Sequence, residues 1–189
     1  MNEFKLKANF DKYFEAPIEV WKKFVNLCEE VDFKKNEILK PSGQKESNAY
    51  FILEGACGSF LWKENNYMCL DIVLENDFFA DQMSLITGQA SPIETIALEK
   101  TKALKISKSN IDKLKQSPFG STLFLIGAEH SFVEKQQQQI DLLMKTAEER
   151  YSLLLLKNPN LLKRIAQKHI ASYLGITTQS LSRIKKVLF

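Results

Sequence analysis

The sequence has few of the residues that build catalytic and metal sites. It contains two histidines, His130 and His169, and three scattered cysteines, Cys28, Cys57 and Cys69. The cysteines show neither CxxC spacing nor a pairing pattern, so we expect buried thiols rather than metal ligands or disulfides. No GxSxG, P-loop or HExxH motif is present. We therefore expect no catalytic residues, no metal site and no enzymatic activity.

Long apolar runs are also absent. No stretch reaches the roughly 18 to 20 uncharged apolar residues that span a bilayer. The segment from Met1 to Lys7 lacks the apolar core of a signal peptide. These absences predict a cytoplasmic protein without a membrane partner. A chain of 189 residues, 44% of them hydrophobic, is long enough for one large domain or a medium and a small one.

Acidic residues are missing from the C-terminal segment 151–189. The other 150 residues carry 19 basic and 23 acidic side chains, so the chain combines an acidic body with a basic tail. Such a division is typical of a tail that contacts a polyanion and a body that does not. The basic residues of the tail are Lys157, Lys163, Arg164, Lys168, Arg183, Lys185 and Lys186.

The spacing of apolar residues predicts strands between two helical parts. Residues 17–28 repeat apolar side chains at helical spacing, whereas from about residue 31 to 106 the period changes to two. Turn-forming residues separate these short segments, which predicts an antiparallel roll or barrel. Helical spacing then returns. We expect a sensor domain over 1–116, a connecting helix over 117–145 and a DNA-binding domain over 146–189.

The connecting helix carries apolar residues seven positions apart, namely Ile126, Val133 and Ile140. A stripe of this kind on a long helix favours pairing with the same helix of a second copy. Packing against the chain's own roll is the alternative explanation, and one helix can do both. The sequence therefore predicts a homodimer joined by this helix.

The segment from about Lys163 to Lys186 has the spacing of a helix-turn-helix. Ala171 is small where a second helix must approach the first, and Gly175 stands where the chain must turn, most easily with positive φ. Agreement at seven positions is far more specific than a lone glycine turn. The inward-facing apolar residues are Ile170, Leu174, Ile176, Leu181 and Ile184.

The second helix of this motif presents side chains that suit DNA. Arginine offers a bidentate fork to guanine, glutamine pairs with adenine, and serine or threonine contacts bases or phosphates. The expected base contacts are Thr178, Gln179, Ser182 and Arg183. We expect Thr177 to cap the helix, and His169 to be a surface residue. The expected phosphate contacts are Thr177, Lys168, Lys185, Lys186 and Arg164.

A roll, a long helix and a helix-turn-helix in this order resemble the Crp/Fnr family of bacterial transcription regulators. The resemblance implies an α+β fold: an N-terminal antiparallel β-roll like the jelly roll of cyclic-nucleotide-binding domains, flanking helices, a long dimerisation helix and an all-α C-terminal part. It also implies a homodimer on a two-fold symmetric operator in double-stranded DNA, with RNA polymerase as a further candidate partner. The chain ends at Phe189 without an evident β-hairpin wing after the second helix.

The resemblance also implies a phosphate-binding cassette, and this chain departs from it. Where the family has Gly-Glu followed about ten residues later by Arg-Ser, the stretch anchored on Gly88 has Ala80-Asp81 and Ser91-Pro92. Without the arginine, a cyclic phosphate would lose its paired charge, so we expect neither cAMP nor cGMP to bind. The residues of this degenerate pocket are Phe79, Ala80, Asp81, Gln82, Met83, Ser84, Ser91 and Pro92.

The sequence thus predicts a dimeric, sequence-specific DNA-binding regulator. Its sensor takes an unknown small-molecule effector or serves as an empty scaffold. Two alternatives stay open. One is a small-ligand-binding or scaffold protein whose helix-turn-helix does not bind DNA, and the other is a haem sensor that uses His130.

Overall fold

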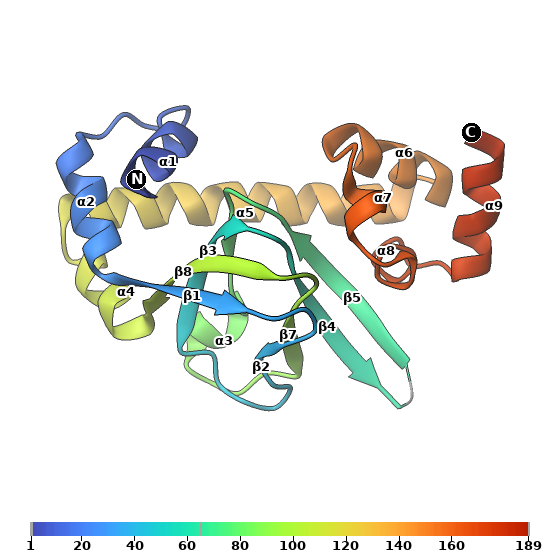
Figure 1. Cartoon of the computed structure of the whole chain (residues 1–189), viewed down its shortest axis with the longest axis horizontal. Coiled ribbons are helices and arrows are strands. Elements are labelled where there is room, and N and C mark those ends of the chain that lie inside the picture. Colours follow the sequence, from blue (N-terminus) through green and yellow to red (C-terminus); the bar gives the residue numbers. More distant parts are fainter. Residues whose placement is uncertain (1, 65, 189) are drawn as a thin grey trace.

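The computed structural model describes residues 2–64 and 66–188. A β-roll occupies the middle of an elongated molecule, with helices at both ends (Figure 1). The strands are β1 (Cys28–Phe33), β2 (Ile38–Lys40), β3 (Asn48–Glu54), β4 (Cys57–Lys63), β5 (Asn66–Val73), β6 (Phe78–Phe79), β7 (Ile93–Ala97) and β8 (Thr101–Ser107). The helices are α1 (Asn2–Phe10), α2 (Ile18–Asn26), α3 (Gln82–Thr87), α4 (Lys108–Lys115), α5 (Pro118–Met144), α6 (Ala147–Lys157), α7 (Leu161–Arg164), α8 (Gln167–Tyr173) and α9 (Thr178–Leu188).

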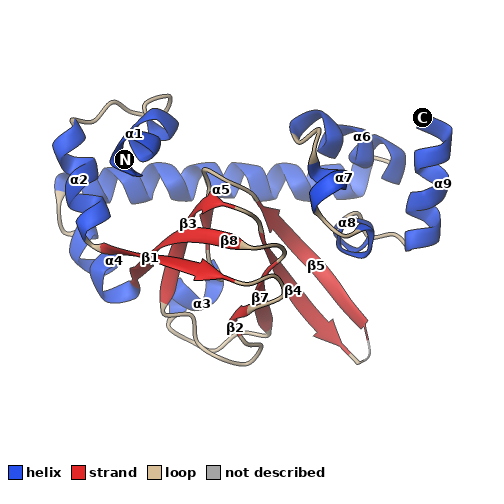
Figure 2. Ribbon diagram, in the orientation of Figure 1, coloured by secondary structure: helices blue, strands red, loops and turns tan. Residues whose placement is uncertain are grey.

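The roll consists of two four-stranded antiparallel sheets (Figure 2). One has the strand order β1-β8-β3-β6 and the other β2-β7-β4-β5. The chain passes between the sheets at Gly55, whose φ is 97° and where a Cβ atom would lie 2.5 Å from the carbonyl oxygen of Lys100. Only glycine fits such a close approach. The predicted α+β fold with an antiparallel, jelly-roll-like N-terminal domain is confirmed.

Strand β3 is buried on both faces. Tyr50 and Ile52 point into the roll, while Phe51 and Leu53 pack in the cluster formed with α1, α2 and α4. A strand covered on both sides reads as a continuous apolar run, because neither face needs polar residues. The flanking helices therefore belong to the same folded unit as the roll.

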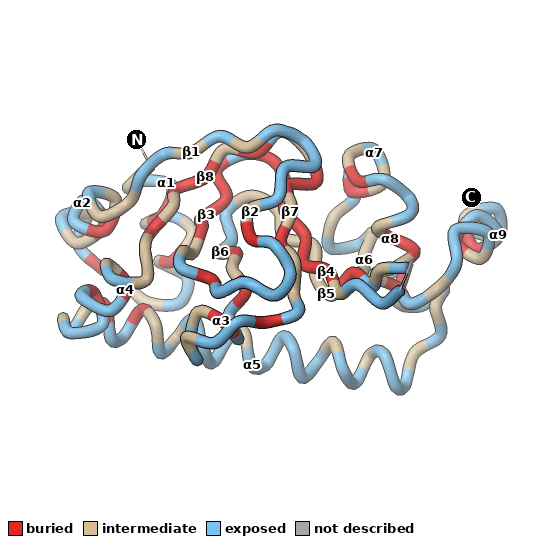
Figure 3. The backbone as a smooth tube through the Cα atoms, turned by 90° about the horizontal axis from the view of Figure 1, so that it is seen from below, coloured by how far each residue is buried: buried red, intermediate tan, exposed pale blue. Residues whose placement is uncertain are grey.

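Helix α5 runs along the length of the molecule and joins its two ends (Figures 1 and 3). Ser117 caps it by accepting a hydrogen bond from Gly120 N, and Pro118 occupies its first turn. The following helix, α6, begins with a capping box between Thr146 and Glu149. No helix of the described residues is long and apolar enough to cross a membrane.

Two helices have no clear signal in the sequence. Helix α1 buries only Leu6 and Phe10, so it shows little amphipathic periodicity. Helix α3 spans one and a half turns and depends on its ends, where Asp81 caps it and Gly88 closes it at a φ of 68°. Tertiary contacts rather than local pattern form both.

Candidate functional site

Helices α8 and α9 pack across a tight turn at the predicted place. Gly175 has a φ of 67°, and the amide of Ile176 donates to Ala171 O at 2.9 Å, which closes the end of α8. The residues expected to face inward share one apolar cluster. Ile170, Ala171, Leu174, Leu181 and Ile184 are at most 6% exposed, and Ile176 packs at the edge of the cluster.

The outer face of α9 is polar and free of acidic residues. Thr177 caps the helix, since its Oγ1 accepts a hydrogen bond from Ser180 N at 3.1 Å. The buried Leu181 and Ile184 fix the rotation of α9, so that the opposite side meets solvent. All four residues expected to contact bases are exposed on that side, namely Thr178, Gln179, Ser182 and Arg183.

Basic side chains surround this face. Lys168 on α8 and Lys186 on α9 are exposed, and Lys185 is half-buried. Within the described part of the chain, neither these lysines nor Arg183 lies in an ion pair. Their charges are therefore not neutralised inside the chain and remain available to an anionic partner.

Arg164 is an exception among the residues expected to contact phosphate. Its guanidinium points at the β-roll, where Nη1 donates to Glu75 Oε2 at 3.0 Å and Nε donates to Glu99 Oε1 at 3.1 Å. These bonds raise the pKa of Arg164. A guanidinium held by two carboxylates is turned toward the roll, so these contacts do not favour the phosphate contact expected for Arg164.

Helix α8 also rests on the hairpin of β4 and β5. The Tyr67 hydroxyl and His169 Nδ1 share a hydrogen bond of 3.1 Å, and the amide of Cys69 donates to Ser172 Oγ at 2.8 Å. His169 is half-buried rather than a surface residue, and burial, followed by the nearby Lys168 charge, lowers its pKa to about 4. The imidazole is therefore neutral at physiological pH.

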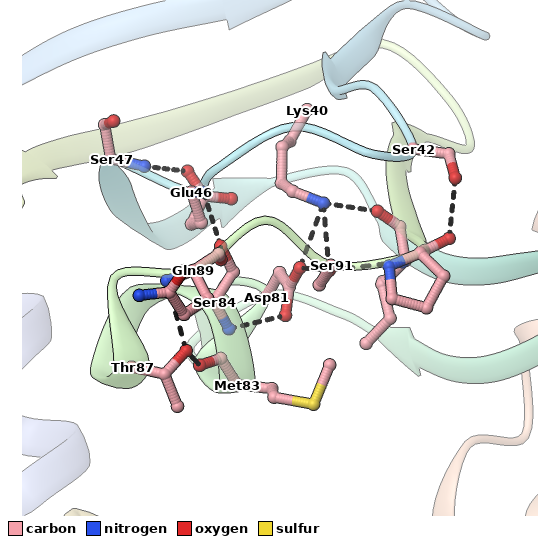
Figure 4. A network of polar contacts seen from close by, with 12 residues as sticks. Lys40, Ser42, Glu46, Ser47, Asp81, Met83, Ser84, Thr87, Gln89 and Ser91 are labelled. Carbon is pink, nitrogen blue, oxygen red and sulfur yellow. Dashed lines mark hydrogen bonds and ion pairs between the residues drawn. The ribbon is translucent and has the colours of Figure 1, made fainter.

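The degenerate cassette encloses a buried ion pair that the sequence does not reveal (Figure 4). Lys40 Nζ on β2 lies 2.9 Å from Asp81 Oδ2, with the two side chains 3% and 0% exposed. Ser91 Oγ donates to the same carboxylate, and Lys40 Nζ also donates to the carbonyl of Ile93. The charge of Asp81 is thus matched within the roll by a lysine from a distant strand.

The cassette residues differ in burial. Phe79, Asp81, Ser84 and Ser91 are buried. Ser84 Oγ accepts a hydrogen bond from the amide of Glu46 at 2.8 Å, which ties α3 to the loop before β3. Ala80 is half-buried. Gln82, Met83 and Pro92 are exposed and do not join the buried group. The interior polar positions are occupied by contacts of the chain with itself.

Helix α5 leaves most of its length uncovered (Figure 3). Only Gly120 and Leu123 are buried in the structure. Of the three residues expected to pair with a second copy, Ile126 is half-buried, whereas Val133 and Ile140 are 63% and 48% exposed. Further exposed apolar residues extend this surface, which we call the α5 stripe: Leu125, Phe132, Val133, Ile140, Leu143 and Met144.

The cysteines and His130 occupy settings without reactive features. Burial raises the pKa of all three thiols, Cys28, Cys57 and Cys69, to about 12, so each is protonated at neutral pH. His130 Nε2 shares a hydrogen bond of 3.2 Å with the Tyr13 hydroxyl, and its Nδ1 lies 3.5 Å from Glu134. Both ring nitrogens have partners in the chain, which does not favour a haem ligand.

Comparison with known proteins identifies the fold. Residues 30–117 match the family model described as cyclic nucleotide-binding domain. FixK2 from Bradyrhizobium japonicum is similar in structure at a TM-score of 0.73 and 21% identity, over 85% of this chain and 84% of that one. CLP, a global regulator of Xanthomonas campestris, has a TM-score of 0.68 at 14% identity over 91% of both chains. The catabolite activator protein of Thermus thermophilus has a TM-score of 0.58 at 19% identity over 95% and 85%. No curated protein matches the chain in sequence.

These similarities confirm the resemblance deduced from the sequence. Residues 30–117 match the model of cyclic nucleotide-binding domains, and the chain shares the fold of these three solved structures over 85% or more of its length.

Proposed function

We propose that this protein is a sequence-specific, DNA-binding transcription regulator that acts as a homodimer. The observation that carries the proposal is the outer face of α9, where four polar side chains are exposed beside basic residues that, in the described part of the chain, lie in no ion pair. An exposed polar helix of this kind fits the major groove, and its N-terminus favours nearby phosphate. CLP, which links cell-cell signaling to virulence gene expression in Xanthomonas campestris, supports the same class of function.

The contacts follow from the position of each side chain. Arg183 forms a fork to guanine, Gln179 pairs with adenine, and Thr178 and Ser182 contact neighbouring bases or phosphates. Thr177, Lys168, Lys185 and Lys186 contact phosphates, and these contacts supply most of the salt-dependent affinity. The resemblance to Crp/Fnr regulators makes RNA polymerase a further candidate partner.

The α5 stripe supplies the dimer contact in this proposal. Six large apolar side chains along one long helix are costly to leave in water, and a second copy of the helix covers them by two-fold pairing. The two α9 helices then meet two half-sites of a palindromic operator.

The roll acts in this proposal without cAMP or cGMP. The Lys40–Asp81 pair occupies the buried cassette, and a cyclic phosphate brought there would face the Asp81 carboxylate without the family's arginine. The effector is a small molecule of another kind, or the roll has no effector. Thermal unfolding with cAMP and with cGMP tests this, because a ligand bound to the folded state raises Tm and these two are expected not to raise it.

Selection of bound fragments from random duplex DNA tests the proposed function. We expect an enriched palindrome, and a steep fall of affinity with salt. Sedimentation of the free protein is expected to give a dimer. Absence of any duplex binding, with the protein folded, would instead support a small-ligand-binding or scaffold role in which α8 and α9 contact no DNA.

A further inference from the structure

Arg164 connects the segment that carries α8 and α9 to three separate turns of the β-roll. Its Nη2 donates to the carbonyl of Gly55 at 3.2 Å and to Glu75 Oε1 at 2.6 Å. The same nitrogen also donates to Glu99 Oε1. With the bonds from Nε and Nη1 described above, every nitrogen of the guanidinium has an acceptor on the roll.

The acceptors are themselves held in place. The amide of Gly55 donates to Glu75 Oε1 at 2.9 Å, which joins the β3–β4 turn to the β5–β6 turn. Burial of the Glu75 carboxylate opposes its ionisation, but the hydrogen bonds from Arg164 and from backbone amides outweigh this and lower its pKa. Glu75 and Glu99 therefore form a fixed receptor for a planar cation, and arginine is the side chain that matches it.

Apolar packing surrounds this contact. Phe60, Cys69 and Leu98 of the roll lie in one cluster with Tyr151 and Leu161 from the C-terminal helices. Apolar packing holds the C-terminal helices against the roll but lets them slide by small amounts. The hydrogen bonds of a guanidinium are directional, so they fix the orientation of these helices on the roll. The fork lies directly before α8, so it fixes the start of the α8–α9 pair relative to the roll.

We propose that Arg164 is a positioning residue that sets the separation of the two α9 helices in the dimer, and with it the spacing of operator half-sites. This inference rests on the proposed DNA-binding function. A shift of one base pair moves a half-site about 3.4 Å along DNA and turns it by about 34°. If the α8–α9 pair is rigidly attached to the roll, the dimer loses affinity for an operator with shifted half-sites. If the attachment is loose, it behaves as a flexible tether and the dimer still binds both half-sites.

The experiment uses the full-length protein and the selected operator, with half-sites moved by one and two base pairs, alongside a duplex with one half-site. For Arg164→Ala we expect single half-site affinity within about twofold of the unsubstituted protein. Its discrimination between correct and shifted spacing is expected to fall about tenfold. Unchanged discrimination would overturn the inference.

A matched variant separates this role from a phosphate contact. Glu75→Gln combined with Glu99→Gln leaves every basic residue in place but weakens the hydrogen bonds that hold the Arg164 guanidinium. This double variant is expected to reproduce the loss of discrimination between correct and shifted half-site spacing. Arg164→Ala is expected to keep the salt dependence of binding, whereas a lost phosphate contact lowers the slope by about 1. A lowered slope, with the double glutamine variant behaving normally, would assign Arg164 to DNA and overturn the inference.

A measurement without DNA distinguishes failure of this inference from failure of the proposed function. The amide of Cys69 donates to Ser172 Oγ across the contact between β5 and α8. Loss of the Arg164 fork is expected to speed hydrogen exchange at this amide about tenfold while the strand centres of the β1–β8–β3 sheet keep their protection. This result supports the positioning role even if no duplex binds, and unchanged exchange at Cys69 counts against it.

Discussion

The Tyr67 hydroxyl on β5 lies 3.1 Å from His169 Nδ1 on α8, so the roll and the α8–α9 pair share a hydrogen bond at a neutral imidazole. The ring also packs against Phe60 at a centroid distance of 5.2 Å. Burial, followed by the nearby charges of Lys168 and Lys35, disfavours the charged ring, and acid is therefore expected to loosen this junction.

The first prediction concerns stability in acid. The folded pKa of His169 is about 4, below its unfolded value of about 6.5, so the stabilisation is complete above pH 6.5 and is lost as pH falls toward 4. The loss is on the order of 1 kcal/mol, because solvent screening reduces the effect at a half-buried ring. Chemical denaturation of the protein and of His169→Gln across this range is the measurement. Parallel pH dependences for the two proteins would contradict the assignment.

The second prediction concerns the buried pair in the cassette. Lys40→Met leaves the Asp81 carboxylate without its cation at 0% exposure, and the expected loss of unfolding free energy is about 3–5 kcal/mol. Adding Asp81→Asn to this variant removes the uncompensated charge and is expected to recover part of the loss. Urea denaturation of both variants and of Asp81→Asn alone measures the coupling. A loss below about 1 kcal/mol for Lys40→Met would mean that the pair contributes little.

The α8–α9 pair could be predicted from the sequence because its determinants are local. Ile170, Leu174 and Leu181 follow helical spacing, and Gly175 marks the turn, so the buried face is encoded within one short segment. The roll was predictable for a related reason, since period-two segments between turns leave few alternatives.

The roles of Arg164 and Lys40 could not be predicted, because their partners lie far away in the chain. Glu99 and Glu75 are 65 and 89 positions from Arg164, and by local context Arg164 belongs to the basic tail. Lys40 at the end of an edge strand reads as an exposed charge, and only the closure of the roll brings Asp81 to it. Pairing between distant charges has no periodic signal in sequence.

The third prediction separates base contacts from phosphate contacts on α9. Arg183→Ala is expected to cost about 1–3 kcal/mol on the selected operator and to relax preference at one base pair. Lys186→Ala is expected to weaken binding to all duplexes alike and to lower the salt slope by about 1. Fluorescence anisotropy on matched and scrambled duplexes measures both. Retained base preference in Arg183→Ala would show that α9 docks differently.

The fourth prediction concerns the α5 stripe. Val133 is 63% exposed in the single chain, so Val133→Glu is expected to leave the fold intact while placing a charge in the dimer contact. Sedimentation is expected to show monomers, and operator affinity is expected to fall about a hundredfold because each half-site then binds alone. Gln116→Glu is the matched control, since it adds the same charge at an exposed position at the end of α4. A dimer that survives Val133→Glu but dissociates when Met83 or Ile86 on α3 is made acidic would move the interface from α5 to α3, whose two apolar side chains are 51% and 72% exposed.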